Sequence, residues 1–353
     1  IDKNQIILVV ILSLIAGMIA KMPFIFNFDE ELFYSRNIGF ISFTMISIYF
    51  AIRNNINKFN LIIITVINIL AALYINTLPP NNNSDVINLA TVHLVLFLWS
   101  LSGYTYIAND FKSSEKRISF LKYNGDLVVI NALMLIAGGI LTGITIGLFG
   151  LIGLNIEKFY FENIGIFGLA SLPIVGTYLI QYNSNLVSKI SPLIAKIFSP
   201  LVLIMLFVYL LSIVYLGKDP YNDREFLLIF NILLIGVMAL IFFSVAESSK
   251  EKSNYEIWLL FLLSLLSIII SLIALSAILF RINEWGFTPN RSAVLGANIL
   301  ILFHMIFVNI KLYSVLRNKS DSLEIRNVIA NYLPVYFIWT IIVVFIFPLV
   351  FGI

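Results

Sequence analysis

Long apolar segments that nearly exclude charged side chains set the strongest constraint on the fold of this chain. Of its 353 residues, 60% are hydrophobic and only 12% are charged, whereas a soluble domain carries about 25% charged residues. About 20 consecutive apolar residues in a helix are enough to cross the hydrocarbon core of a bilayer. The sequence therefore predicts an all-α, polytopic transmembrane helix bundle and excludes a water-soluble fold.

Eleven segments have the length and composition of transmembrane helices. They predict one integral membrane domain over residues 1–353, because no loop between them is long enough to fold separately. The first segment also resembles a signal peptide, but we interpret it as a helix, and we expect residues before Ile1. The second is short, and we expect Arg36 to extend its charge to the interface there. The predicted spans are 6–22, 37–52, 61–78, 86–107, 127–154, 164–182, 200–216, 226–246, 257–280, 292–310 and 333–351.

Lys and Arg residues are divided unevenly between the two sides of the predicted bundle. The N-terminal segment and alternate loops hold 15 of the 22 Lys and Arg residues, and the other loops hold 7. Short loops rich in Lys and Arg face the cytoplasm. This pattern predicts a cytoplasmic N-terminus and, after eleven crossings, an extracytoplasmic C-terminus.

Glycines recur every four residues in the fifth span. Gly139, Gly143 and Gly147 share one helix face, and the absence of side chains along a face lets another helix approach closely. We favour a static packing seam. The alternative is a pore-lining or sliding helix, whose smooth face permits motion.

Two histidines, His93 and His304, lie within predicted spans. A histidine in a membrane can relay protons or bind a metal, but no acidic residue lies at a comparable depth, so we favour helix–helix hydrogen bonds. The chain has no cysteine, which excludes disulfides and thiolate ligands. No catalytic triad, phosphate-binding glycine loop or metal-ligand spacing occurs, so we expect no catalytic residue, no metal site and no cofactor.

Two loops carry basic residues among apolar ones and are expected on the cytoplasmic side. The segment 183–199 has the pattern of an amphipathic helix on the membrane surface. The loop 108–126 is compatible with anionic lipid or with a cytoplasmic protein partner, and we expect no nucleic-acid partner. Its basic residues are Lys112, Lys116, Arg117 and Lys122.

The loop at 281–291 has the residues of a structured helical hairpin. Thr288 is a suitable N-cap, Pro289 fits the first helical position, and Gly286 permits a positive φ. Trp285 is expected in the outer interface. We favour a structural turn over the alternative, a contact for an anionic group. The charged residues close enough in sequence to pair are Arg281, Glu284 and Arg291.

This turn, Arg-Ile-x-x-Trp-Gly-Phe-Thr-Pro-Asn-Arg, resembles the family of bacterial membrane proteins called domain of unknown function 4153, where a similar Tyr-Gly-Leu-Thr-x-x-Arg turn recurs. Phe198-Ser-Pro200 and the segment 220–226 are also similar to that family. The resemblance covers roughly residues 160–350 and is strongest at 281–291; Trp and Phe replace the expected Tyr and Leu. It implies a multi-pass protein of the bacterial envelope, which we expect in the cytoplasmic membrane, and it implies no activity.

Three functions are compatible with this sequence. We favour a permease or channel-like protein, because short loops leave the bundle itself as the place of action. The alternative is a non-catalytic scaffold or sensor that works with a soluble partner through its basic face. The third is an intramembrane enzyme acting on a lipid-linked substrate, with His93 or His304 as the base.

Overall fold

The chain is helical throughout the part that the computed structural model describes. That part comprises residues 3–81, 84–108, 110, 112–151, 154–182, 199–204, 206–208, 210–211, 221, 224–247, 253–319 and 321–352. Every regular element in these ranges is an α- or π-helix, and no strand occurs in them. The all-α class predicted from the sequence is therefore confirmed.

Nine helical segments within the described residues are long and apolar enough to cross a membrane, and each overlaps a predicted span. The predicted spans 200–216 and 226–246 overlap two shorter apolar helices, Ser199–Val208 and Phe230–Ala246. The total of eleven spans and the orientation of the termini therefore stay predictions. The nine segments are Lys3–Phe26, Glu30–Arg53, Lys58–Thr77, Asp85–Ile107, Ser114–Gly147, Glu157–Tyr182, Asn254–Trp285, Pro289–Leu316 and Ser322–Phe351.

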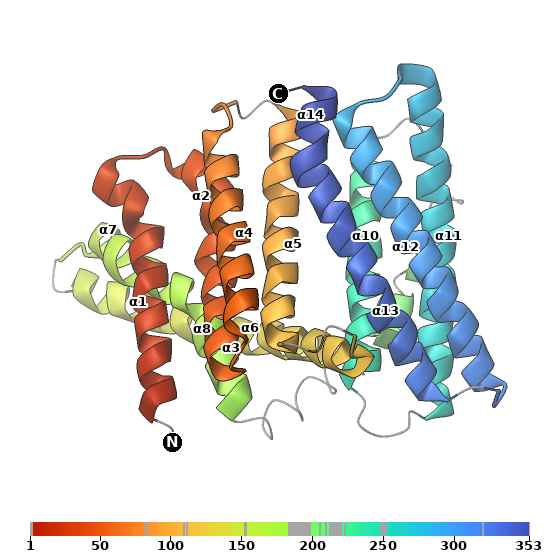
Figure 1. Ribbon diagram of the computed structural model, residues 1–353, viewed down its shortest axis with the longest axis horizontal. Coiled ribbons are helices and arrows are strands. Elements are labelled where there is room, and N and C mark those ends of the chain that lie inside the picture. The colour runs from red at the N-terminus through yellow and green to blue at the C-terminus, as the bar shows by residue number, and fades with distance from the viewer. Residues whose placement is uncertain are drawn as a thin grey trace. The chain divides into compact units, whose positions relative to one another are not determined.

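Residue contacts divide the chain into two compact units. The first unit comprises residues 1–112 and 123–187, with residue 353, and the second comprises residues 113–122 and 188–352. In the first unit, α1 packs mainly against α8, and α5 is flanked by α2, α3 and α4 (Figure 1). Its elements are α1 (Lys3–Phe26), α2 (Glu30–Gly39), η1 (Phe40–Thr44), α3 (Met45–Arg53), α4 (Lys58–Thr77), α5 (Asp85–Ile107), α6 (Ser114–Leu151, whose first turns belong to the second unit), α7 (Glu157–Tyr160), η2 (Phe161–Gly165) and α8 (Ile166–Tyr182).

An aromatic cluster forms part of the core of the first unit. The ring of Phe50 lies 4.9 Å from that of Tyr106 and 5.2 Å from that of Tyr123, measured between centroids. The hydroxyl groups of Tyr123 and Thr177 are 2.7 Å apart, so a hydrogen bond joins α6 to α8. A buried phenol needs such a partner, because an unsatisfied hydroxyl is costly away from water.

The second unit is built around a hairpin of α11 and α12, which make the most extensive contacts, and both α10 and α13 pack against it. Gly296 of α12 lies directly against the indole of Trp339 on α13, and a Cβ at this position would overlap the ring. Glycine therefore sets how closely these two helices approach. The elements are α10 (Arg224–Glu247), α11 (Asn254–Trp285), α12 (Pro289–Leu316), α13 (Ser322–Ile341), η3 (Ile342–Ile346) and α14 (Phe347–Phe351).

The structure corrects the extent of two loops predicted from charged residues. The loop expected at 108–126 is helical from Ser114 onward, and Asp126, expected at the end of this loop, is buried inside α6. The long loop expected after Lys311 is reduced to residues 317–321, where Asp321 caps α13. Charged residues lower hydrophobicity but do not break a helix, so the helices extend past their apolar segments. Of the expected surface helix 183–199, residues 183–198 lie outside the described part.

Arg36, expected to extend its charge to the interface, is buried against the end of a neighbouring helix. Its side chain is only 5% exposed, and it donates hydrogen bonds to the carbonyl oxygens of Leu78 at 2.9 Å and Pro79 at 2.7 Å. These carbonyls follow the C-terminal end of α4, where the helix leaves acceptors unpaired and the dipole favours a positive charge. The end of another helix therefore satisfies both terminal nitrogens of this guanidinium, while its Nε has no hydrogen-bond partner among the described residues.

Candidate functional site

A pocket of about 150 Å³ lies among η1, α3, α4 and α5 in the first unit, and we call it the α3–α4–α5 pocket. Half of its lining residues carry a hydroxyl or an amide, and none carries a charge. The polar residues are Thr44, Ser47, Thr65, Asn68 and Thr105, and the apolar ones are Ile48, Ala51, Leu61, Ile64 and Ile69.

The pocket extends from one end of the helices to the middle of α4. Asn68 is ten residues beyond Lys58, the first residue of α4, which corresponds to about 15 Å along the helix axis. This is half the thickness of a hydrocarbon core of about 30 Å. Thr105 lies near the last residue of α5, at the end that the charge pattern predicts to be cytoplasmic. Polar residues therefore border the pocket from that end of the helices to the middle of α4.

Two hydroxyl groups in the α3–α4–α5 pocket donate to the backbone of their own helical segments. Ser47 donates to Phe43 at 2.7 Å and Thr105 donates to Ser102 at 2.8 Å. The protons of these hydroxyls are therefore satisfied within the helices, and the surface that the pocket exposes is almost entirely apolar. The pocket is therefore suited to a small, largely apolar solute.

A π-helical turn, η1, forms one wall of this pocket. It interrupts the α-helical geometry between α2 and α3 and ends at Thr44, whose hydroxyl lines the pocket. Just before the turn, Gly39 packs against α5, and a Cβ there would lie 3.0 Å from a methyl of Leu98. Single π turns within α-helices are frequent at functional sites.

His304 occupies a fully buried aromatic cluster in the second unit. Its Nδ1 lies 3.0 Å from the hydroxyl oxygen of Tyr336 on α13, and its ring stacks on Tyr332 at a centroid distance of 4.3 Å. The Tyr336 hydroxyl also lies within hydrogen-bonding distance of the sulfur of Met238, at 3.3 Å. Within the described residues, His304 Nε2 is buried without a hydrogen-bond partner. The hydrogen bond between His304 and Tyr336 joins α12 to α13, as expected if this histidine holds two helices together.

His93 has a different environment. Its Nδ1 lies 2.9 Å from the carbonyl oxygen of Leu89, one turn earlier in the same helix, so this contact does not join two helices. His93 belongs to the first unit and His304 to the second. The structure therefore does not bring the two histidines together within one unit.

The glycine face of α6 has no neighbour in the described part of the chain. No heavy atom there lies within 4 Å of a Cβ built at Gly139, Gly143 or Gly147. The packing seam and the sliding helix both remain predictions. Several glycines that do contact other helices closely lack a repeating pattern in the sequence that would single them out; they include Gly17, Gly39, Gly176 and Gly296.

The turn at 281–291 forms as predicted. The Thr288 hydroxyl accepts from the backbone N–H of Arg291 at 3.3 Å, Pro289 begins α12, and Gly286 has a φ of 75°. Arg291 also donates to the carbonyl oxygens of Trp285 at 2.8 Å and Gly286 at 2.7 Å. The guanidinium carbons of Arg281 and Arg291 lie 5.5 and 5.7 Å from the Trp285 ring centroid. These contacts favour the structural turn, because Arg291 binds the backbone of the hairpin itself.

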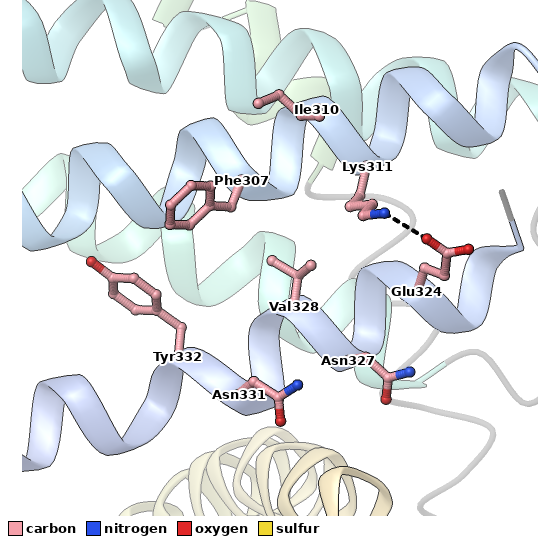
Figure 2. A pocket seen from close by; sticks show the side chains of 8 residues that line it. All are labelled: Phe307, Ile310, Lys311, Glu324, Asn327, Val328, Asn331 and Tyr332. Atoms are coloured by element: carbon pink, nitrogen blue, oxygen red, sulfur yellow. Dashed lines mark hydrogen bonds and ion pairs between the residues drawn. The ribbon is translucent and has the colours of Figure 1, made fainter. Parts of the chain in front are cut away.

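A groove of about 480 Å³ lies between α12 and α13 in the second unit, and we call it the α12–α13 groove (Figure 2). Lys311 and Glu324 form an ion pair in it, with 2.6 Å between Nζ and Oε2. Neither residue is predicted from the sequence to form a site, because the groove depends on two helices that meet beyond a turn. The lining residues are Phe307, Ile310, Lys311, Glu324, Asn327, Val328, Asn331 and Tyr332.

No match to this chain is found among known protein-family models, curated proteins or solved structures. The resemblance of residues 160–350 to a bacterial membrane family stays a prediction. Among the described residues, no three His, Asp or Glu side chains gather in a way that could hold a metal ion. The candidate functional sites are therefore identified from the positions and chemistry of their residues, without comparison to a relative.

Proposed function

We propose that this chain is a permease or channel-like protein of the bacterial cytoplasmic membrane, and that the α3–α4–α5 pocket is part of the path of its solute. The nine apolar helices are compatible with a multi-pass membrane protein. The single observation that carries the proposal is a pocket, bordered by five hydroxyl- or amide-bearing residues, that reaches the middle of α4. Polar groups are rare in the hydrocarbon region unless they serve packing or a substrate path.

A small uncharged solute fits this pocket best. Its volume of about 150 Å³ is below the range of about 300–1,000 Å³ typical of drug-sized ligands. A charged solute at this depth would need a partner of opposite charge or a coordination shell, and the lining residues carry no charge. The almost entirely apolar surface that the pocket exposes favours a solute with few hydrogen-bonding groups.

The third function, an enzyme with a histidine base, has less support. His304 is 0% exposed, and the rings of Tyr332 and Phe242 lie over it at centroid distances of 4.3 and 4.6 Å. A general base must come within hydrogen-bond reach of its substrate. The covering rings would have to move before His304 could act.

Cysteine accessibility tests the proposed path directly, because the chain contains no cysteine and each introduced thiol is the only one. Thr44→Cys and Ser47→Cys are reacted with a membrane-impermeant methanethiosulfonate in intact cells and in inverted vesicles. We expect both thiols to react, because water enters a solute path.

Two controls define the outcome. Ile62→Cys, on α4 with a 61% exposed side chain outside the pocket lining, should not react, since it faces lipid. Lys58→Cys, at the start of α4, should react because it lies at the interface. If the thiols at positions 44 and 47 are as unreactive as the one at 62 from both sides, the pocket is not a solute path and the proposal fails.

A further inference from the structure

The α12–α13 groove is polar at one end and aromatic at the other. Figure 2 shows Lys311 and Glu324 facing each other at one end, and Phe307 and Tyr332 at the other. Lys311 is five residues before the last residue of α12, and Glu324 is the third residue of α13. The charged end therefore lies at the helix termini, and the aromatic end lies deeper along both helices.

The aromatic end is open to the surroundings of the second unit. Phe307 is 45% exposed and Ile310 is 54% exposed. If these helices cross a membrane, such exposed apolar side chains contact acyl chains, because lipid takes the place of water there. The volume of the groove also falls within the range of small-molecule sites. An occupant with a polar head and an apolar chain would match both ends.

The charges around the groove favour an anionic head. The ion pair of Lys311 and Glu324 is neutral as a unit. The nearby segments 113–122 and 312–326 contribute six further basic residues and two further acidic ones. The basic residues are Lys116, Arg117, Lys122, Arg317, Lys319 and Arg326, and the acidic ones are Glu115 and Asp321.

Two hydrogen bonds hold the basic start of α6 beside the groove. The Ser114 hydroxyl donates to Asn331 Oδ1 at 2.8 Å, and Arg117 donates to the carbonyl oxygen of Ala330 at 2.9 Å. Figure 2 shows Asn331 pointing from α13 toward the neighbouring helix. This helix contains three of the four basic residues that the sequence predicted to contact anionic lipid or a protein. The two hydrogen bonds therefore place the predicted binding region for anionic lipid or protein beside the α12–α13 groove.

The Lys311 ammonium has capacity for a second partner. Its one hydrogen bond to a described residue is to Glu324, whereas an ammonium group has three N–H donors. Asn327, one turn after Glu324 on α13, adds an amide that can donate to a phosphate oxygen. A phosphate at this end would therefore meet a charged and a neutral donor without breaking the ion pair.

We propose that the α12–α13 groove binds an anionic phospholipid. Its phosphate lies at Lys311 and Asn327, and an acyl chain follows Phe307, Val328 and Tyr332 toward the middle of the helices. A soluble phosphate compound would use only the charged end and leave the apolar half of the groove without a partner. This assignment is independent of the solute path in the first unit.

Lipid retention by the full-length chain tests the assignment. The purified protein is incubated with equal concentrations of dioleoylphosphatidylglycerol and dioleoylphosphatidylcholine, and bound lipid is measured by native mass spectrometry. We expect preferential retention of phosphatidylglycerol. Lys311→Gln should weaken this binding about fivefold, since one basic residue near an anionic membrane surface contributes about 1 kcal/mol. Val328→Trp should also weaken it, because the indole fills the groove without changing its charge.

A matched lysine provides the control. Lys158 also lies near a glutamate, at 3.8 Å from Glu162 in the first unit, so Lys158→Gln removes the same charge away from the groove and should leave binding unchanged. Glycerol phosphate at the lipid concentration should not displace the bound lipid. Equal retention of both lipids, equal effects of the two lysine variants, or displacement by glycerol phosphate would each overturn the proposal. If Val328→Trp does not fold, the effect of Lys311→Gln on lipid binding alone decides whether the groove binds the lipid.

Discussion

The Thr44 hydroxyl donates to the amide oxygen of Asn68 at 3.1 Å, and this hydrogen bond joins η1 to α4 halfway along the helix. The Asn68 amide nitrogen donates to the carbonyl oxygen of Ile64 at 2.9 Å, so both ends of the amide are satisfied. The pocket is therefore bounded by a fixed polar contact and does not depend on a freely rotating side chain.

This contact should be measurable as a coupling between two substitutions. Thr44→Val and Asn68→Leu each remove it, so the double variant should lose less stability than the sum of the single variants. We expect a coupling energy of about 0.6 kcal/mol, the average for side-chain hydrogen bonds within membranes. Unfolding in denaturing detergent measures the three free energies. Strictly additive effects would mean that the bond contributes nothing.

Arg36 should distinguish hydrogen bonding from charge alone. Arg36→Met leaves the carbonyl oxygens of Leu78 and Pro79 without their donor, and each unsatisfied buried group costs about 1–3 kcal/mol. Arg36→Lys keeps the charge but lacks the planar fork that reaches two acceptors, so its stability should fall between those of wild type and Arg36→Met. Thermal unfolding of the three proteins measures the order. A lysine variant as stable as wild type would contradict the proposed role of the fork.

A side chain at position 296 should destabilise the packing of α12 against α13. Gly296→Ala places a methyl group in the indole of Trp339, and such overpacking costs about 1–3 kcal/mol. Gly236, in α10 of the same unit, has no heavy atom of the described residues within 4 Å of a built Cβ. Gly236→Ala should therefore be neutral or stabilise its helix by up to about 1 kcal/mol. Equal melting temperatures for the two variants would show that α12 and α13 are not closely packed.

The same comparison tests the glycine face of α6. Gly176 of α8 faces Leu127 and Asn131 of α6, and a Cβ there would crowd both side chains, so Gly176→Ala should destabilise the first unit. Gly143→Ala should be neutral or stabilising unless a partner helix covers that face. A loss of stability at position 143 that matches the loss at 176 would support the packing seam predicted from the sequence.

Local chemistry explains which features could be predicted from the sequence. The nine spans follow from apolar length, which needs no knowledge of neighbours. The turn at 281–291 follows from residues that act within a few positions of each other: Gly286 supplies its φ, and Thr288 caps the helix that Pro289 begins. Both predictions depend on short-range rules; the structure confirms the turn and, among the described residues, shows nine helical segments long and apolar enough to cross a membrane.

Features set by contacts between distant residues could not be predicted in the same way. Arg36 is satisfied by carbonyl groups 42 and 43 residues later, and Gly296 matters because Trp339 lies against it. Lys311 and Glu324 are both charged residues near helix ends, but their groove exists because α12 and α13 pack side by side. No local sequence pattern indicates which of these distant residues will be in contact.

The π turns have a further consequence for how three of the helices face their neighbours. Each turn, η1, η2 or η3, lies inside a segment long enough to cross a membrane. A π turn contains one residue more than the α-helical turn it replaces, and one residue corresponds to a rotation of about 100° around the axis. Side chains after the turn are thus offset from the stripe that the preceding residues form. Deleting one residue at such a turn would restore a regular α-helix but rotate all later side chains around the helix axis. Each of these helices therefore presents one set of side chains before the turn and a differently directed set after it.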